Sequence, residues 1–346
     1  MRLRIKKKIS EVSLMQSSRQ SMVKKVLKFG GSSLNNPAFI ENVLDIILTT
    51  YASTSQLVVV FSAFGNVTDQ LIELGQKAKA QTGYSNLSEE IKQRHIDTAI
   101  ALLPHTHVPF LLDKLDTVFN DLNTCISTII RNGELSKKSL DELMGYGEKM
   151  STLILCEALK KYIVNARLLN AETIIVTDRN FGQGHINFKI TNDRIINYFK
   201  SNVSVVIVPG FIAATKKDEP ITLGRGGSDY TAAVLGAALD SDVVELWTDV
   251  DGIMTADPKK DCHASVIPEL NYEKAMELSL LGAKVIHCFA LLPISQKNIP
   301  ILIKNSFRKE APGTLIRNSS PIVNPISSFP GYISSPESSK IKTNLN

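Results

Sequence analysis

Short, mostly apolar runs separated by helical patterns restrict the fold of this 346-residue chain more than any other feature. The run 57–61 is apolar throughout, so both faces of the strand it predicts are buried, as in a parallel sheet covered by helices. We therefore expect an α/β fold, a three-layer α/β/α sandwich with a mostly parallel central sheet, whose ligands bind at the carboxyl ends of the strands. The runs that predict strands are 26–29, 57–61, 164–169, 203–208, 243–247 and 301–304.

Helical patterns fill the intervals between these runs. A helix is expected after Asn36-Pro37, because proline is favourable near a helix start and apolar residues follow at helical spacing. Another is expected from about Thr68. Residues 88–160 are predicted to be mostly helical, with interruptions near 104–109 and at 145–147, and a further helix is expected at 272–284.

The two ends differ in composition from the 23–317 region, which we expect to be the folded domain. Eight Lys/Arg and one Glu in residues 1–25 carry a local charge of about +7, whereas the whole chain carries +5. The rest is therefore slightly acidic, which argues against a nucleic-acid-binding body. Residues 1–22 predict a basic, disordered extension, and residues 318–346, with eight Ser and four Pro, predict a flexible tail.

Several classes of protein are excluded or disfavoured by what the sequence lacks. No apolar run approaches 18 residues, so no membrane span is expected. Four scattered cysteines without a CxxC pair are typical of reduced thiols and predict a cytoplasmic protein, with plastid import through the basic arm as the alternative. Neither the Walker A pattern nor GxGxxG occurs, which disfavours P-loop and nicotinamide chemistry.

The segment 224–231, Gly-Arg-Gly-Gly-Ser-Asp-Tyr-Thr, has the strongest functional signal. Clustered glycines before a helical run leave backbone N–H groups free at a helix start, which favours an anion. Arg225 adds a donor suited to carboxylate or phosphate, and Asp229 adds an acid suited to a metal-bound phosphate or an ammonium. A glycine-rich turn before a buried helix is the alternative interpretation.

Three further positions carry candidate chemistry. Lys28 ends the first strand just before Gly30-Gly31-Ser32-Ser33 and could reach transferring phosphate oxygens, or could be an edge lysine in solvent. Glu148, in Gly147-Glu148, could receive an ammonium, although its spacing alone favours an ordinary acid in the first turn of a helix. The segment 247–258 places three Asp after a strand and suits nucleotide or Mg²⁺ recognition, or else a solvated turn.

Taken together, these segments resemble the aspartokinases of the amino-acid-kinase superfamily. The resemblance covers about 24–317. Its pieces occur in family order: KFGGSS at 28–33, Ser62-Ala63 followed by Thr68, Gly147-Glu148-x-x-Ser151, Pro209-Gly210-Phe211, the segment 224–231, Trp247 to Asp257 with Pro258, GAKVIH at 282–287 and PGTL at 312–315.

This resemblance implies a role for each matching residue. Catalytic roles fall to Lys28 and Asp229, aspartate binding to Ser62, Thr68, Glu148, Arg225 and Ser228, and ATP binding to Lys28, Gly30, Gly31, Ser32, Thr248, Asp249, Met254, Asp257 and Lys284. Segment 178–182 looks like the family's substrate-proximal loop. The amino-acid-binding part would be about 23–210 and the nucleotide-binding part about 211–317.

The implied reaction is phosphorylation of L-aspartate by MgATP to 4-phospho-L-aspartate and ADP, on the route to lysine, threonine, methionine and diaminopimelate. ATP and Mg²⁺ are the expected cofactors, with the metal carried by ATP and held by no protein ligand directly. No nucleic acid or membrane partner is expected, and a homodimer through the kinase domain is compatible with the resemblance.

The sequence departs from the family pattern at three places. Met254 stands where an aromatic residue usually contacts the nucleotide, and Cys288 replaces the usual Pro after His287. The chain ends about where paired regulatory ACT domains would begin, so we expect no feedback inhibition by lysine or threonine through such domains.

Two alternatives to an aspartate kinase remain at this point. One is another kinase of the superfamily, acting on glutamate, acetylglutamate or UMP. The other is a catalytically silent amino-acid sensor. Arg225 and Glu148 together favour a free amino acid as substrate, and retention of Lys28 and Asp229 favours an active enzyme.

Overall fold

The computed structural model describes residues 23–201, 205–256, 261, 263–282 and 286–318. Its elements are, in chain order, β1 (Lys24–Phe29), η1 (Gly31–Leu34), α2 (Pro37–Tyr51), β2 (Gln56–Phe61), α3 (Val67–Ala80), α4 (Tyr84–Leu102), α5 (Val108–Asn132), α6 (Lys137–Lys160), β3 (Arg167–Leu168), η2 (Ala171–Thr173), β4 (Val176–Thr177), α7 (Phe188–Phe199), β5 (Val205–Pro209), β6 (Ile212–Thr215), β7 (Pro220–Thr222), α8 (Gly227–Ala238), β8 (Val243–Thr248), β9 (Glu269–Leu270), α9 (Tyr272–Leu280), α10 (Cys288–Ser295), β10 (Ile301–Asn305) and β11 (Thr314–Ile316).

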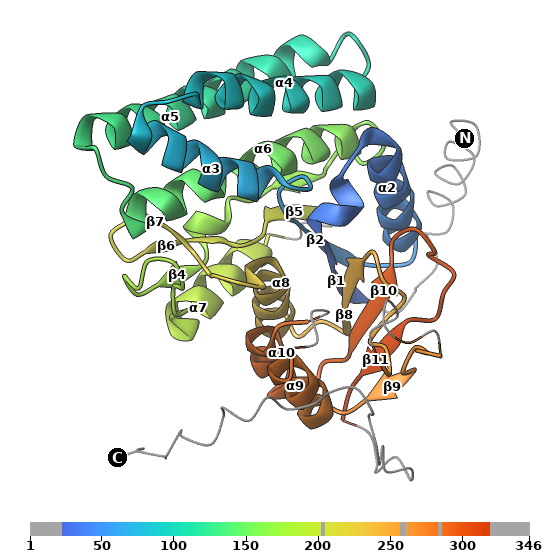
Figure 1. The fold of residues 1–346 in the computed structure, drawn as a ribbon. Helices are drawn as coiled ribbons and strands as arrows, with labels where there is room; N and C mark the ends of the chain where they lie inside the picture. Colours follow the sequence, from blue (N-terminus) through green and yellow to red (C-terminus); the bar gives the residue numbers. More distant parts are fainter. Residues whose placement is uncertain (1–22, 202–204, 257–260, 262, 283–285, 319–346) are drawn as a thin grey trace, which may run out of the picture.

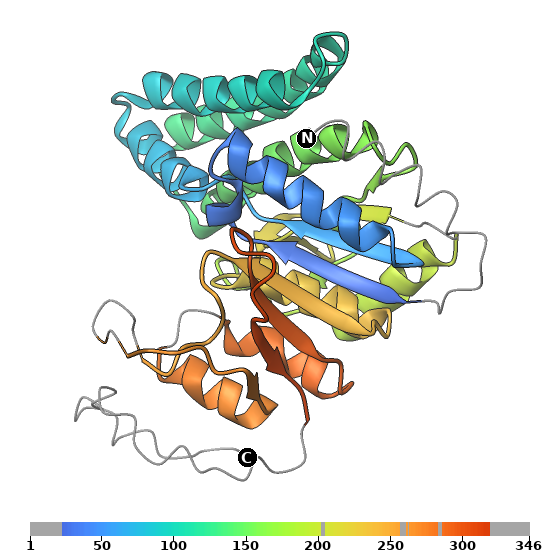
Figure 2. The same cartoon turned by 90° about the vertical axis from the view of Figure 1, so that its right-hand side faces the viewer.

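An eight-stranded sheet with the order β3-β5-β2-β1-β8-β10-β11-β9 forms the centre of the molecule. Every neighbouring pair in it is parallel except β10 and β11. In Figure 2, β2, β1 and β8 lie side by side. The prediction of a mostly parallel sheet is confirmed. A second sheet, β4-β6-β7, carries an antiparallel hairpin that the apolar runs did not indicate.

Helices cover both faces of the large sheet, as Figure 1 shows. Successive strand residues alternate between two cores, because side chains on a strand point to opposite faces. Leu27 and Phe29 of β1 belong to the core with α2 to α6, whereas Val26 belongs to the core with α7 to α10. The three-layer sandwich is therefore confirmed. By the same alternation, Lys28 lies on the face covered by α8.

The expected strand at 164–169 is mostly wrong. Only β3, at Arg167–Leu168, pairs with the sheet, and it does so at the edge. Val164 is 83% exposed and lies in the turn after α6. Apolar composition alone does not make a strand, because a strand also needs a neighbour with free backbone groups along its length.

The expected interruption at 145–147 is also wrong. Helix α6 runs unbroken through Gly145 and Gly147, and the break falls instead after α5, where Gly133 adopts a left-handed φ of 64°. Close packing explains the two helical glycines: a Cβ on Gly147 would lie 2.8 Å from Cβ of Ala63. Glu148 is consequently in mid-helix, so its interpretation as a first-turn acid is wrong.

The remaining helix predictions agree with the structure in part. Asn36 caps α2 by accepting from the N–H of Phe39 (3.0 Å), and α3 begins one residue before Thr68. The helix expected at 272–284 ends at Leu280, and residues 283–285 lie outside the described part of the chain. So do the extension at 1–22 and the tail from 319 onward.

The packing at Gly147 gives a test of the fold. Gly147→Ala should lower the free energy of unfolding by about 1–3 kcal/mol, because the new methyl group overpacks against Ala63. Urea unfolding measures this change. Ala63→Gly in the same chain removes the opposing methyl group and should recover part of the loss. Equal losses with and without Ala63→Gly would contradict the close contact.

Candidate active site

A cavity of about 640 Å³ opens at the carboxyl edge of the sheet. Strand β1 supplies Lys28, the turn after β2 supplies Ser62, and the turn after β8 supplies Asp249. The first turn of α8 and the middle of α6 close the other sides. The cavity is lined by Lys28, Gly31, Ser32, Asn35, Phe39, Ser62, Ala63, Phe64, Gly65, Asn66, Thr68, Asp69, Glu148, Phe211, Gly224, Arg225, Gly226, Gly227, Ser228, Asp229, Asp249 and Phe307.

Most of the residues predicted for the site therefore meet in one cavity. They are Lys28, Gly31, Ser32, Ser62, Thr68, Glu148, Arg225, Ser228, Asp229 and Asp249. Gly30 lies just behind, since a Cβ there would be 3.4 Å from Nζ of Lys28. Thr248 and Met254 do not line the cavity, although the Thr248 hydroxyl donates to Asp249 (3.0 Å). Asp257 and Lys284 lie outside the described residues.

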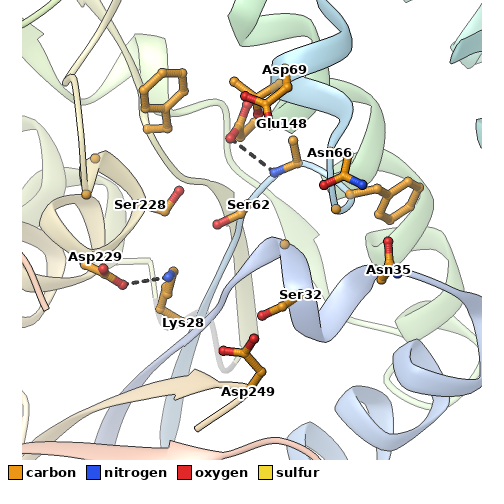
Figure 3. Close-up of a pocket in the computed structure, with 18 of the residues that line it drawn as sticks. Lys28, Ser32, Asn35, Ser62, Asn66, Asp69, Glu148, Ser228, Asp229 and Asp249 are labelled. Atoms are coloured by element: carbon orange, nitrogen blue, oxygen red, sulfur yellow. Dashed lines mark hydrogen bonds and ion pairs between the residues drawn. The ribbon is translucent and has the colours of Figure 1, made fainter. Parts of the chain in front are cut away.

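Lys28 and Asp229 form an ion pair across the cavity wall, with 2.7 Å between Nζ and Oδ1 (Figure 3). Their side chains are only 13% and 14% exposed. An ammonium at this depth needs a partner, because burying an unpaired charge is costly. The pair joins the central strand to α8 and excludes the interpretation of Lys28 as an edge lysine in solvent.

The glycine-rich segment turns sharply into α8. Gly224 and Gly226 both adopt left-handed φ values, 73° and 71°, which favour glycine. Gly226 is the N-cap and supplies no side chain. The N–H of Gly227 donates to the carbonyl of Gly224 (3.0 Å), and the next N–H groups of α8 have no side-chain cap. The helix dipole favours an anion at this end. This arrangement suits an anion, and the anion site itself stays a prediction.

Glu148 is buried, with 3% of the residue exposed, and faces the cavity from α6. The N–H of Ala63 donates to its Oε1 (3.1 Å), whereas Oε2 has no hydrogen-bond partner among the described residues. Burial raises the pKa of Glu148 to about 8, against the opposing effects of backbone N–H groups and the charge of Lys28. An unpartnered buried carboxylate oxygen is suited to an ammonium donor from a ligand.

Arg225 is exposed at the cavity, and none of the described residues holds its guanidinium by a hydrogen bond or an ion pair. Its five donors remain available for a ligand carboxylate or phosphate. Three kinds of group thus face one cavity. Glu148 suits an ammonium, Lys28 is a partly buried cation, and Arg225 is an available bidentate donor.

The segment 178–182 does not line the cavity. It lies behind the glycine-rich segment: a Cβ on Gly224 would be 3.0 Å from the carbonyl oxygen of Gly182. Several lining residues escaped the sequence analysis, namely Asn35, Phe39, Phe64, Gly65, Asn66, Asp69 and Phe307. Asn66 and Asp69 flank the predicted Thr68, so the start of α3 was the available signal for those two.

The acidic side chains of the cavity suit a metal ion that arrives on a nucleotide. Asp229 and Asp249 both line the cavity near Lys28 and Ser32 (Figure 3). Within the described residues, no group of three or more His, Cys, Asp or Glu side chains is placed to hold a metal by itself. Mg²⁺ commonly binds through one or two carboxylates together with phosphate oxygens and water, which this arrangement fits.

Comparison with known proteins identifies the relatives of this chain. The sequence model of the amino acid kinase family matches residues 24–305. Aspartokinase 1 of Arabidopsis thaliana, described as chloroplastic, is 35% identical over 301 residues, which cover 84% of this chain and 51% of the relative. The bifunctional aspartokinase/homoserine dehydrogenase 2 of the same plant is 34% identical over 84% of this chain and 32% of its own length.

Solved structures give the same relationship. Escherichia coli aspartokinase III in complex with aspartate and ADP has a TM-score of 0.78 and 29% identity, over 86% of this chain and 65% of that chain. The same enzyme with lysine and aspartate has a TM-score of 0.76. The chain spans about a third to a half of the length of the curated relatives named above.

The buried Glu148 predicts a specific dependence of stability on pH. Its pKa is about 8 in the folded state and near 4.5 when the carboxyl is solvated, so the folded chain binds the extra proton between these values. This contribution to stability is complete below about pH 4.5 and is lost as the pH rises through about 8.

Glu148→Gln should remove this dependence. Relative to the parent chain, its free energy of unfolding should improve between pH 5 and pH 9 by roughly a few kcal/mol. Urea unfolding at several pH values measures the difference. Glu142→Gln, a change at a partly exposed site on the same helix, is the matched control. Parallel pH profiles for the parent and Glu148→Gln would contradict the raised pKa.

Proposed function

The chain belongs to the amino acid kinase family, and from the chemistry of its cavity we propose that it is an aspartate kinase. It would transfer the γ-phosphoryl group of MgATP to the side-chain carboxylate of L-aspartate, giving 4-phospho-L-aspartate and ADP. The same reaction would open a route to lysine, threonine, methionine and diaminopimelate. Aspartate and MgATP are the proposed substrates.

The observation that carries this proposal is that Glu148 and Arg225 both line the cavity that contains Lys28. A free amino acid has an ammonium and a carboxylate on one carbon. The unpartnered Oε2 of Glu148 suits the ammonium, and the available guanidinium of Arg225 suits the α-carboxylate. When the ammonium and the α-carboxylate of the amino acid are both bound, its short acidic side chain would point toward Lys28 and the start of α8.

The reaction requires positioning and charge stabilisation rather than a protein nucleophile. The substrate carboxylate oxygen attacks the γ-phosphorus, forming a new P–O bond as the bond to the β-phosphate oxygen breaks and ADP leaves. Lys28 and the free N–H groups of α8 would stabilise the negative charge on the transferring group. Gly30, Gly31 and Ser32 would lie against the phosphates, and Asp229 would hold Lys28 and the Mg²⁺ side in place.

The relatives support this assignment. The curated relatives named above include aspartokinases, and the E. coli aspartokinase III structure with a TM-score of 0.78 is a complex with aspartate and ADP. Thr68 and Ser228 line the same cavity and would complete the aspartate site. Asp249 would lie on the nucleotide side.

The other candidate substrates fit less well. Acetylglutamate offers a neutral amide N–H in place of an ammonium, so it brings no positive charge to offset the cost of an ionised, buried Glu148. UMP has neither an ammonium nor an α-carboxylate. Glutamate has both groups but carries an extra methylene, so the length of the cavity decides between it and aspartate. A silent sensor would not need the Lys28–Asp229 pair beside a helix start that suits phosphate.

None of the described helices is both long and apolar enough to cross a bilayer. We propose a cytoplasmic location on the basis of the reduced cysteines. The alternative is import into plastids, since two plant relatives are named as chloroplastic proteins. Microscopy of the full chain fused to a fluorescent protein distinguishes these two compartments.

A substrate panel tests the proposed activity. The purified chain is assayed with MgATP and aspartate, glutamate, acetylglutamate or UMP, with acyl phosphate trapped as the hydroxamate and ADP followed by a coupled assay. We expect turnover with aspartate to exceed that with every other acceptor. Preferential turnover of glutamate or acetylglutamate would move the assignment to that substrate, and ATP-dependent activity with none would favour the sensor.

Lys28 should be essential for turnover and nearly neutral for binding of the amino acid. Lys28→Ala should lower kcat by at least 10²–10³-fold, roughly the cost of losing one preorganised group that stabilises transition-state charge. The dissociation constant for aspartate, measured by calorimetry, should change little. Lys25→Ala is the matched control, since Lys25 lies on the same strand and pairs with Glu245. A near-normal kcat for Lys28→Ala would refute its role.

Arg225 should act on the amino acid and not on the nucleotide. Arg225→Ala should raise KM for aspartate by roughly 10–100-fold, because one charge-assisted interaction is worth about 1.5–3 kcal/mol. KM for ATP should change little. Steady-state kinetics with each substrate varied in turn separates the two effects. If the increase is confined to ATP, Arg225 belongs to the nucleotide side.

A further inference from the structure

Asp141 is a buried carboxylate that the proposed reaction does not use. It lies on α6, and only 2% of the residue is exposed. Burial raises its pKa, against the opposing hydrogen bonds that it accepts. Such a group is costly unless each oxygen is partnered, so its partners indicate what it stabilises.

The two oxygens of Asp141 hold two segments that are distant in sequence. The N–H of Gly182 donates to Oδ2 (2.7 Å), and the hydroxyl of Thr222 donates to Oδ1 (2.7 Å). Thr222 is the last residue of β7 and is itself buried. Its carbonyl accepts from the N–H of Gly184 (2.8 Å), which ties the same two segments together a second time.

These segments lead directly to Arg225. Two residues separate Thr222 from Arg225, and one of them, Gly224, packs against the carbonyl of Gly182. The guanidinium of Arg225 has no partner among the described residues. The position of Arg225 in the ligand-free chain is therefore set by its backbone, which continues from Thr222, a hydrogen-bond partner of Asp141.

Asp141 and Glu148 are seven residues apart on α6. Seven residues make almost two full turns, so both residues lie on one face of the helix, with their Cα atoms about 10 Å apart along its axis. Helix α6 thus supplies Glu148 to the proposed ammonium site directly. It reaches the proposed carboxylate site indirectly, through the hydrogen bonds of Asp141 to Gly182 and Thr222.

We infer that Asp141 is a positioning residue for Arg225 and that α6 sets the distance between the ammonium and carboxylate sites of the cavity. This inference rests on the proposed function for the identity of the ligand, an α-amino acid. The hydrogen bonds of Asp141 themselves are independent of it.

The first test needs no substrate. Hydrogen exchange of the ligand-free chain is compared for the parent, Asp141→Ala, Thr222→Val, Asp141→Asn and Glu142→Gln. Exchange at Gly182 and at 224–227 should be faster in Asp141→Ala, and the 224–227 amides should also exchange faster in Thr222→Val. Asp141→Asn should stay close to the parent, because its amide can accept from Gly182 while donating to the Thr222 hydroxyl. Glu142→Gln is the control on the neighbouring residue.

The second test asks whether Asp141 acts through Arg225. Thr222→Val and Asp141→Ala should raise KM for aspartate by about tenfold or more, as expected for a binding group displaced by roughly 1 Å. KM for ATP should be unchanged. In the Arg225→Ala background the same substitutions should add little, because coupled residues give non-additive effects.

Three outcomes would overturn the inference. They are unchanged exchange at 224–227 in folded Thr222→Val, a loss of stability with unaltered KM for aspartate, and fully additive effects with Arg225→Ala. If Asp141→Ala does not fold, the exchange and KM measurements on Thr222→Val decide the role of Asp141. Failure of the parent chain to phosphorylate aspartate would refute the proposed function separately, since the exchange measurement still decides the role of Asp141.

Discussion

The ion pair between Lys28 and Asp229 is the interaction on which the geometry of the cavity depends. Strand β1 is central, paired with β2 on one side and β8 on the other, so Lys28 does not lie at a free edge of the sheet. The pleat directs Lys28 to the face of α8. The first turn of α8 must therefore lie close by, and only a glycine-rich turn with left-handed φ values at Gly224 and Gly226 brings the chain there so abruptly. The Lys28–Asp229 ion pair thus accounts for both the buried lysine and the position of the start of α8.

Helix α6 forms the opposite side of the cavity, and its buried polar residues are unusual for a core helix. Gly147 permits contact with Ala63, and this contact places the N–H of Ala63 within hydrogen-bonding distance of Glu148. The Ser151 hydroxyl donates to the carbonyl of Ser62 (2.8 Å), which fixes the same turn from one helical turn further along. The close approach of the Ala63 backbone to α6 therefore positions the Glu148 carboxylate at the cavity. Gly147 permits this approach, although the sequence analysis interpreted it as a helix break.

The sequence predicts those parts of the fold that depend on local pattern. Buried parallel strands, the start of α2 at Asn36-Pro37 and the glycine-rich turn each have a signal within a few residues, because strand burial, capping and left-handed φ are local requirements. The two bonds of Asp141 depend on segments up to 81 residues apart in the chain. The packing of Gly147 on Ala63 brings together segments that are at least as distant. Nothing near Asp141 distinguishes it from a solvated helical acid. Most of the cavity residues were predictable because they follow strands or begin helices, where backbone groups are free.

The charges of the ligand-free cavity suggest how the two poles act in sequence. Lys28 is neutralised by Asp229, and Glu148, with a pKa of about 8, is mostly protonated near neutral pH. Arg225 is then an exposed positive charge at the cavity with no partner among the described residues, so a carboxylate is attracted to it first. An arriving ammonium stabilises the ionised form of Glu148 and displaces its proton, because an opposite charge within hydrogen-bonding distance lowers the pKa of a buried acid. A neutral buried acid is less costly to keep in the empty cavity than an ionised one, and it becomes a strong acceptor only when its partner is present.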